Sequence, residues 1–314
     1  MDLMTIIEVP AELAETYAKF DGAEGREWVE RLPALAMDFL DRWNLRLDGK
    51  SMHGMASLVL PVRTPEGTPA VLKLQRPNEE NIGEPLALRH WDGDGIVRLL
   101  AADEPTCTML LERLDPSRPL SSLPDAEQAL TILTGLLGRL VQHQAPTGMR
   151  RLGDIAAAML ADTPGKATRL ADPADAARLH SWAAIVGEVL DEPGDRLLLW
   201  DLHYDNVLAP LPGTDREPWL AIDPKPLAGD PGFELFPALD NRFEDLEATG
   251  DVPRALRRRF DLMTGHLGLD RARAARWTVG RVLQNALWHI EDEDDGKLVP
   301  DHLAIAAAMA HYLA

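Results

Sequence analysis

The sequence predicts an α+β protein with two lobes. One is a small lobe built on antiparallel strands over residues 1–114, with a helical N-terminal segment, and the other is a larger, mainly helical lobe over residues 115–314. Three observations predict this fold class. The 314 residues are enough for about two domains of roughly 150 residues each. Short strand-like runs separated by turn residues lie between residues 45 and 112. Beyond residue 125, apolar residues instead recur every three or four positions, as on a core-facing helix.

The N-terminal lobe begins with a helical segment, because apolar residues recur at helical spacing between residues 11 and 40. Strand-like runs follow, and turn residues at 64–68 predict that two of these runs pair as an antiparallel hairpin. Residues 49–54 are expected to form a turn, and residues 84–91 a helix. The predicted strands of this lobe are 45–47, 58–62, 70–74, 96–100 and 108–112.

The C-terminal lobe follows a predicted linker at residues 115–119, which contains two prolines. Between residues 130 and 140, leucines repeat at intervals of three and four, which predicts a core helix. A short insertion of strands is expected at 197–199 and 219–222, followed by helices to the end. The other helices predicted for this lobe are 154–160, 174–190 and 282–290.

The composition limits the classes of partner. The chain has 51 acidic against 32 basic residues, a formal net charge of -19 and a pI of about 4.8. Such a chain repels a phosphate backbone, so nucleic acid is not an expected partner, whereas a small cationic molecule suits the surface. The single cysteine, Cys107, excludes an internal disulfide and favours a cytoplasmic location. No apolar run approaches the roughly 18 to 20 residues that a bilayer requires, so no membrane span is expected.

The strongest chemical pattern is a short polar loop. It reads Asp-Leu-His-Tyr-Asp-Asn over residues 201–206, and Asp223 follows at the end of the next predicted strand. Such an arrangement can bring three oxygen ligands together, and oxygen ligands suit Mg²⁺, which completes its shell with waters and substrate phosphates. Asn206 and Asp223 are the candidate metal ligands, and Asp201 is the candidate acceptor of a proton from an attacking hydroxyl. The same spacing also fits a turn capped by polar side chains.

A lysine and a glutamate precede this loop in the order that phosphate binding requires. Lys73 lies on a predicted strand, and Glu84 begins the predicted helix that follows it. An ion pair between them would hold the lysine in place for phosphates. Taken singly, Lys73 also fits an edge-strand residue that aids solubility, and Glu84 fits a first-turn acid favoured by the helix dipole. Together with Asp201, Asn206 and Asp223, the two residues match the parts of a kinase-type phosphotransferase.

From about residue 47 to residue 292, the sequence resembles the aminoglycoside phosphotransferases, and more closely their streptomycin 6-phosphotransferase and hydroxyurea phosphotransferase branch. The segment at 222–231 is the most specific to that branch. The segments that carry the resemblance are 70–74 (AVLKL), 83–88 (GEPLAL), 111–114 (LERL), 201–208 (DLHYDNVL), 222–226 (IDPKP) and 229–231 (GDP).

The resemblance implies a protein-kinase-like fold that binds ATP between its two lobes. It places the adenine near Glu112, Arg113 and Leu114. It also implies that Lys73 contacts the α- and β-phosphates and that Glu84 orients Lys73.

The resemblance further implies that Asp201 is the catalytic base and that Asn206 and Asp223 hold magnesium. Lys225 lies close to the metal-binding aspartate, where it can meet the transferring phosphoryl group. A surface lysine between two prolines is the alternative interpretation of Lys225.

Two features depart from related sequences. The turn at 49–57, which would cover the phosphates, lacks the three-glycine pattern of protein kinases. Leu199 and Trp200 precede Asp201 where the family commonly has His-Gly, and a tryptophan in place of glycine changes the packing of the catalytic loop.

The acceptor is expected to contact the C-terminal helix. Trp288 and Asp292 lie on the face opposite to its apolar core face. With Asp205 and Asp230, they can form an acidic, aromatic-walled pocket for a cationic or sugar-like alcohol. The acidic residues at the end of this helix also fit a solvated surface. No zinc site is assigned to the histidines of these segments.

These observations predict an ATP- and magnesium-dependent O-phosphotransferase for a small-molecule alcohol, with streptomycin or a related aminocyclitol as the first candidate. One alternative is a metabolic kinase for a sugar, an amino sugar or a choline-like alcohol. Another is a nucleotide-binding pseudoenzyme with a regulatory role, motivated by Trp200 beside Asp201. The sequence does not indicate the oligomeric state or the hydroxyl that is phosphorylated.

Overall fold

The computed structural model describes residues 7–293 and 295–313 of the chain. These residues form two compact units. Unit 1 runs as far as Asp115 and also includes Pro210–Arg216. Unit 2 consists of Pro116–Ala209 and the chain from Glu217 onward.

Unit 1 begins with two helices, α1 (Ala11–Phe20) and α2 (Gly22–Arg42). The helical segment predicted from residue 11 to residue 40 is therefore interrupted. Gly22 adopts a left-handed φ of 58° just after α1 ends, as glycine commonly does at the end of a helix. Both helices contribute to a core shared with the sheet. The buried residues of α2 are Gly25, Trp28, Leu32, Ala36, Phe39 and Leu40.

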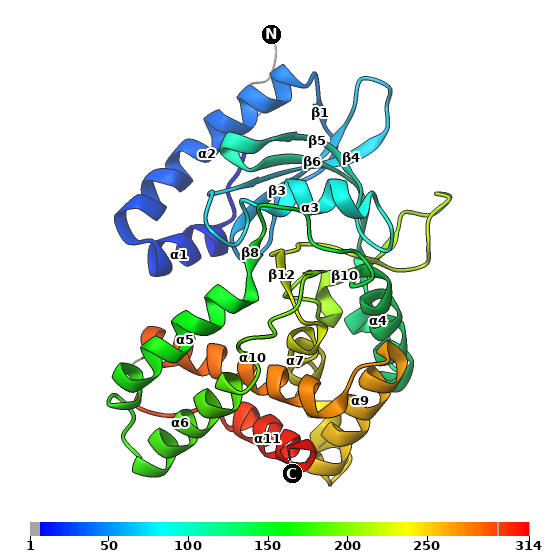
Figure 1. Cartoon of the computed structure of the whole chain (residues 1–314). Helices are drawn as coiled ribbons and strands as arrows, with labels where there is room; N and C mark the ends of the chain where they lie inside the picture. Colours follow the sequence, from blue (N-terminus) through cyan, green and yellow to red (C-terminus); the bar gives the residue numbers. More distant parts are fainter. Residues whose placement is uncertain (1–6, 294, 314) are drawn as a thin grey trace. The chain divides into compact units, whose positions relative to one another are not determined.

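The strands of unit 1 form an antiparallel sheet, visible in Figure 1. They are β1 (Arg46–Leu47), β2 (Met52–His53), β3 (Ser57–Arg63), β4 (Pro69–Gln75), β5 (Leu99–Asp103) and β6 (Thr108–Glu112). The order is β1-β3-β4-β6-β5, with β2 paired to β3. The pairing of β3 with β4 confirms the predicted hairpin.

Two predictions in this sheet were wrong in detail. The expected turn at 49–54 contains β2, and the strand expected at 96–100 begins only at Leu99. Ile96 and Val97 are buried ahead of β5, so their apolar character reflects burial rather than membership of the strand. A 3₁₀ turn, η1 (Glu104–Thr106), joins β5 to β6.

Alternation along β4 places its side chains on two different faces. Ala70, Leu72 and Leu74 belong to the core formed with α1 and α2. Lys73 and Gln75 therefore point to the other face, toward α3 (Glu84–Trp91), which has the bounds predicted from the sequence.

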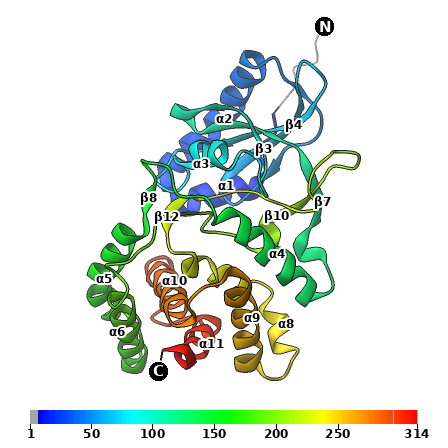
Figure 2. The ribbon, with the colours of Figure 1, turned by 45° about the vertical axis from the view of Figure 1, so that its right-hand side comes forward.

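Unit 2 is mainly helical. Its longer helices are α4 (Ala126–Leu140), α5 (Leu152–Ala167), α6 (Pro173–Gly187), α9 (Val252–Leu267), α10 (Arg271–Asp292) and α11 (Pro300–Met309). The four helices predicted in this region lie within or close to α4, α5, α6 and α10. α10 is central, because 13 of its residues are buried and it packs against α5, α6 and α11 (Figure 2).

Short elements complete unit 2 and carry most of the polar residues of interest. The predicted linker at 115–119 is instead part of a strand, β7. Strands of two to four residues show no clear period in the sequence, which explains why β8, β10 and β12 were not predicted as strands. The strands are β7 (Leu114–Pro119), β8 (Arg150–Arg151), β9 (Arg196–Leu198), β10 (Val207–Pro210), β11 (Leu220–Ala221) and β12 (Leu227–Gly229). The short helices are η2 (Leu120–Ser122), η3 (Tyr204–Asn206), η4 (Pro231–Glu234), α7 (Phe236–Asp240), α8 (Phe243–Glu247) and η5 (Ala310–Tyr312).

This architecture confirms the predicted α+β class, with an antiparallel sheet in one part of the chain and mostly helices in the other. None of the helices described is both long enough and apolar enough to cross a membrane.

Candidate active site

A buried ion pair joins the sheet of unit 1 to α3. The Lys73 ammonium donates to both carboxylate oxygens of Glu84, at 2.7 and 2.9 Å, and Gln75 donates to Glu84 Oε2 at 2.7 Å. Lys73 is 4% exposed and Glu84 is 1% exposed, so each charge depends on the other for stabilisation. β4 lies between β3 and β6, so Lys73 is not an edge-strand residue. The predicted pairing of the two residues is present.

In unit 2, hydrogen bonds within the loop after β9 hold the Asp201 backbone. Asn206 Nδ2 donates to the Asp201 carbonyl at 2.9 Å, and the Asn206 N–H donates to the His203 carbonyl at 3.0 Å. His203 Nδ1 accepts from the Asp205 N–H at 3.3 Å and so caps η3. These contacts give His203 and the Asn206 amide nitrogen a role in the shape of the loop.

The hairpin of β10 and β11 brings Asn206 close to Asp223. Val207 pairs with Ala221, and the Ile222 N–H donates to the Asn206 carbonyl at 2.9 Å. Asn206 precedes one arm of the hairpin and Asp223 follows the other, so both residues lie at the same end of it. Asp223 adopts a left-handed φ of 54°, which turns the chain immediately after β11.

Lys225 faces Asp201. Its ammonium donates to Asp201 Oδ2 at 2.9 Å, and its N–H donates to the Leu199 carbonyl at 2.9 Å. Burial acts to raise the pKa of the Asp201 carboxyl, but the charge and hydrogen bond of Lys225, with the charges of His203 and Arg281, outweigh burial and lower this pKa. Asp201 is therefore ionised at neutral pH, the state that a proton acceptor requires.

Trp200, the residue before Asp201, has a left-handed φ of 72°. Glycine adopts this conformation freely, whereas other residues adopt it at a cost of roughly 1 to 2 kcal/mol. The loop backbone at this position is therefore one that glycine favours, although the residue is tryptophan. The backbone N–H of Trp200 donates to the Glu234 carboxylate.

Glu234 is almost completely enclosed, with 1% of its surface exposed. Burial raises its pKa to about 7. The hydrogen bond from the Trp200 backbone N–H and the charge of Arg281 act to lower this pKa but do not outweigh burial. This carboxyl group reaches Trp200 from η4, outside the segments in which the sequence predicted catalytic residues.

The residues expected near adenine lie at the end of β6 and the start of β7. Glu112 Oε1 accepts from the Arg98 N–H at 2.8 Å and pairs with Arg216 at 3.0 Å. Arg113 pairs with Asp48 at 2.9 Å. The Glu112 and Arg113 side chains thus stabilise unit 1 itself, and Leu114 is buried beside them in the chain.

The four predicted acceptor residues have different surroundings. Trp288 is 39% exposed, and its ring centroid lies 5.9 Å from that of Trp200, so it is near the loop that contains Asp201. Asp205 is exposed and accepts from Asn241 Nδ2 at 3.4 Å. Asp292 is exposed one turn beyond Trp288 on α10.

Asp230, the fourth, is engaged within the fold. Its Oδ1 accepts from the Gly232 N–H at 2.8 Å, and its Oδ2 accepts from Arg273 Nε at 2.6 Å. Because Asp230 is 8% exposed and both oxygens have partners, the structure makes it a cap of η4 and an anchor for Arg273.

Sequence reasoning missed two arginines beside Trp200. The Arg150 guanidinium lies 4.1 Å from the centroid of the Trp200 ring, and the Arg281 guanidinium lies 4.9 Å from it. Arg281 is seven residues before Trp288 on α10. This spacing places both side chains on one face of the helix, and it is the sequence feature that could have pointed to Arg281. Arg150 lies on the two-residue strand β8, which gave no signal.

Among the residues that the structure describes, no group of three or more His, Cys, Asp or Glu side chains is placed to hold a metal ion. Mg²⁺ commonly takes only one or two protein oxygens and completes its shell with water and phosphate. The amide oxygen of Asn206 and the carboxylate of Asp223, at one end of the hairpin, fit that requirement.

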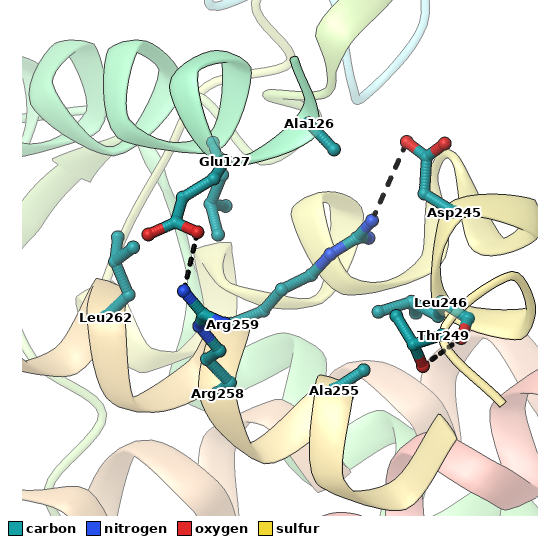
Figure 3. Close-up of a pocket in the computed structure, with 10 residues that line it drawn as sticks. Ala126, Glu127, Asp245, Leu246, Thr249, Ala255, Arg258, Arg259 and Leu262 are labelled. Carbon is teal, nitrogen blue, oxygen red and sulfur yellow. Dashed lines mark hydrogen bonds and ion pairs between the residues drawn. The ribbon is translucent and has the colours of Figure 1, made fainter. Parts of the chain in front are cut away.

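A pocket of about 130 Å³ in unit 2 lies among α4, α8 and α9 (Figure 3). In it, Arg258 pairs with Glu127 at 2.6 Å, and Arg259 reaches toward Asp245 at 4.0 Å. Arg259 also donates to the carbonyls of three residues between 238 and 242. The predicted site residues do not line this pocket, so we assign it no part in catalysis.

Comparison with known proteins gives consistent results. The family described as "Aminoglycoside/hydroxyurea antibiotic resistance kinase" matches residues 42–293. A streptomycin 6-kinase from Streptomyces glaucescens is 56% identical over 310 residues, 99% of each chain. A hydroxyurea phosphotransferase from Kitasatospora aureofaciens is 56% identical over 289 residues, 91% of this chain and 82% of that protein.

Among solved structures, a choline/ethanolamine kinase family protein from Mesorhizobium loti has a TM-score of 0.57 at 16% identity, covering 90% of this chain and 92% of the other. This likeness supports the kinase-like fold, and it confirms the fold predicted from the sequence. The family match and the sequence relatives together show that this chain belongs to the aminoglycoside/hydroxyurea antibiotic resistance kinase family.

Proposed function

We propose that this protein transfers the γ-phosphate of ATP to a hydroxyl group of streptomycin or of a closely related aminocyclitol. The observation that carries this proposal is the 56% identity to a streptomycin 6-kinase along 99% of both chains. The name of that relative points to the 6-hydroxyl as the acceptor. The hydroxyurea phosphotransferase relative makes hydroxyurea the first competing acceptor to test.

The ATP phosphates would bind the Lys73 ammonium. Glu84 and Gln75 keep this ammonium at a fixed place on the sheet, so that little reorganisation is needed when the nucleotide arrives. The adenine would lie near residues 112–114, where the Leu114 side chain and the backbone remain as contacts because the Glu112 and Arg113 side chains have partners of their own.

Asn206 and Asp223 would hold Mg²⁺. The Asn206 amide nitrogen already donates to the Asp201 carbonyl, so its Oδ1 is the atom that would face the cation. When bound, Mg²⁺ neutralises the charge that develops on the transferring phosphoryl group.

Asp201 would accept the proton of the attacking hydroxyl. Its carboxylate is kept ionised by Lys225, and its backbone is held by Asn206. Lys225 would turn from Asp201 toward the transferred phosphoryl group as negative charge builds there. Trp288, Asp205 and Asp292 would contact the cationic acceptor through their exposed surfaces.

The test is mass spectrometry of the products formed with ATP and Mg²⁺. The acceptor panel should contain streptomycin, other aminoglycosides, hydroxyurea, choline, simple sugars and amino sugars. We expect streptomycin to gain one phosphate, about 80 Da, and to be used with the highest kcat/KM. Preferential phosphorylation of choline or of a sugar would overturn the proposed acceptor, and ATP binding with no product from any acceptor would support the pseudoenzyme alternative.

A further inference from the structure

Trp200 connects the catalytic loop to two arginines from different parts of unit 2. Its ring is buried, with only 2% of the residue exposed. Arg150 of β8 lies 4.1 Å from the ring centroid, and Arg281 of α10 lies 4.9 Å from it. Guanidinium groups at these distances are attracted by the negative face of an indole ring. The side chain is therefore fixed from two elements, although its backbone has a strained, left-handed φ of 72°.

Arg150 also contacts the partner of the catalytic carboxylate. Its Nη2 donates to the Lys225 carbonyl at 3.1 Å, while the Lys225 ammonium donates to Asp201 Oδ2 at 2.9 Å. The same guanidinium thus touches the residue before Asp201 and the residue that pairs with Asp201. Displacing the Trp200 ring would remove the contact by which Arg150 connects the two sides of the Asp201–Lys225 pair.

Arg281 fixes the ring from α10. It also lies 5.6 Å from the Trp288 ring and donates to Gln284 at 2.9 Å. Two cations against one ring repel each other, and the nearby carboxylates of Asp201 and Glu234, which both interact with the Arg281 charge, offset that repulsion.

We propose that Trp200 is a positioning residue for phosphoryl transfer: its ring, held by Arg150 and Arg281, keeps Asp201 and Lys225 in place beside each other before the reaction. This inference rests on the proposed function, because it assigns Asp201 the role of proton acceptor. It explains why a bulky aromatic residue is kept at a backbone position that glycine would occupy without strain.

The first test compares Trp200→Phe with Trp200→Leu. Both remove the indole and keep the same backbone requirement, but only phenylalanine retains an aromatic face for the arginines. We expect Trp200→Phe to keep kcat within about 3-fold. We expect Trp200→Leu to lower kcat by about 10- to 100-fold, as for a small misplacement of reacting groups, with KM for ATP changed by less than about 3-fold. Equal kcat values for the leucine variant and the wild type would overturn the proposal.

A second pair of variants avoids any change to the buried ring. Arg150→Met removes the contacts with Trp200 and Lys225, and Arg151→Met changes the exposed neighbour on the same strand. We expect a kcat loss of about 10-fold or more for Arg150→Met and none for Arg151→Met. Equal losses in the two variants would indicate a general effect on β8 and would contradict the proposal.

Crystal structures of the wild type and of Trp200→Leu and Arg150→Met provide a readout that needs no acceptor. The proposal predicts that the Asp201–Lys225 contact persists in the wild type and is lost in both variants. An unchanged contact would overturn the inference even if activity falls. If the wild type phosphorylates no acceptor, the proposed function fails, while the crystal structures still decide whether Trp200 positions the pair.

Discussion

At Asp201, burial and the charge of Lys225 act on the carboxyl pKa in opposite directions. Burial acts to raise the pKa of Asp201, and the ammonium 2.9 Å away outweighs it. Without that ammonium, the desolvation of the carboxylate would have less compensation.

Lys225→Met is therefore expected to raise the pKa of Asp201. Because the ionised carboxylate is the active form, the acidic limb of the kcat/KM profile should move to higher pH, and kcat should fall as well if Lys225 meets the phosphoryl group. A pH–rate profile that extends from pH 9 down into the acidic range where the wild-type limb lies would test this, with Lys19→Met, on α1, as the control. An acidic limb at the wild-type position would contradict the role assigned to Lys225.

The raised pKa of Glu234 predicts that the free energy of unfolding depends on pH. Its pKa in the folded protein is about 7, above the ordinary value of 4.5. Its contribution to the free energy of unfolding is therefore complete below about pH 4.5 and is lost as pH rises through 7. The loss is of order 3 kcal/mol. Asp240, whose pKa is raised to about 6 mainly by burial and by Asp301, adds a change of the same sign.

Glu234→Gln should remove the share of that pH dependence that belongs to Glu234. We expect the free energy of unfolding in urea to fall less between pH 5 and pH 8 in Glu234→Gln than in the wild type, because glutamine does not ionise. The exposed Glu79→Gln variant should behave like the wild type. Equal pH dependence in the Glu234→Gln variant and the wild type would show that the Glu234 pKa is not raised.

The sequence predicted a contact between residues that lie close together along the chain. The Lys73–Glu84 pair could be predicted because a strand lysine and the first residue of the next helix are close in sequence and in space. The contacts of Arg150, Arg281 and Glu234 with Trp200 join segments 34 to 81 residues apart, and no local pattern encodes them. Asp230 shows the converse. Its acidic side chain led to the prediction of a substrate contact, whereas in the structure it caps η4 and pairs with Arg273.

At the scale of elements, the segment between β10 and β11 is anchored by side-chain contacts. The connecting residues Pro210–Arg216 belong to unit 1. The Arg216 side chain is only 6% exposed. It donates to the carbonyls of Gly93 and Ile96 at 3.0 and 2.9 Å and pairs with Glu112 at 3.0 Å. The segment between the two candidate metal ligands is thus anchored by one arginine.

Arg216→Ala should destabilise the protein, because it leaves the Glu112 carboxylate and two carbonyls with one partner fewer. We expect a loss of about 2 to 4 kcal/mol in urea unfolding. Arg63→Ala removes an ion pair whose arginine is 48% exposed and should cost less than about 1 kcal/mol. Similar losses for the two variants would contradict a structural role for the Arg216 anchor.

The predictability of elements depended on their length. The helix at 84–91 and the hairpin of β3 and β4 were predicted because periodicity and turn residues agree there. The break between α1 and α2 depends on one glycine conformation, and β7 was obscured by its prolines, Pro116 and Pro119.

At the scale of the whole molecule, nucleotide binding can be separated from catalysis. A ligand that binds only the folded state at 100 times its Kd stabilises a protein by about 2.7 kcal/mol. For a chain of 314 residues, that corresponds to a rise in Tm of roughly 4 °C. We expect Mg²⁺-ATP to raise the Tm of the wild type and of Lys19→Met, and to have little effect on Lys73→Met, because Lys73 is the proposed phosphate ligand. An unchanged response in Lys73→Met would remove Lys73 from the nucleotide site.

The fold class and the family could be predicted for the whole molecule because the 201–206 loop, Asp223 and Lys73 occur in a fixed order. The acceptor site could not be predicted to the same depth. Its candidate residues come from two segments, Asp205 from the 201–206 loop and Trp288 and Asp292 from α10, and no local pattern predicts that Trp288 packs against Trp200.

The most direct test of the central claim is the rate of streptomycin phosphorylation by the wild type, Asp201→Asn and the exposed control Asp191→Asn. The account predicts that Asp201→Asn lowers kcat by about 10²- to 10⁴-fold while Mg²⁺-ATP still raises its Tm, and that Asp191→Asn matches the wild type. Full activity of Asp201→Asn, or the absence of phosphorylated streptomycin with the wild type, would contradict it.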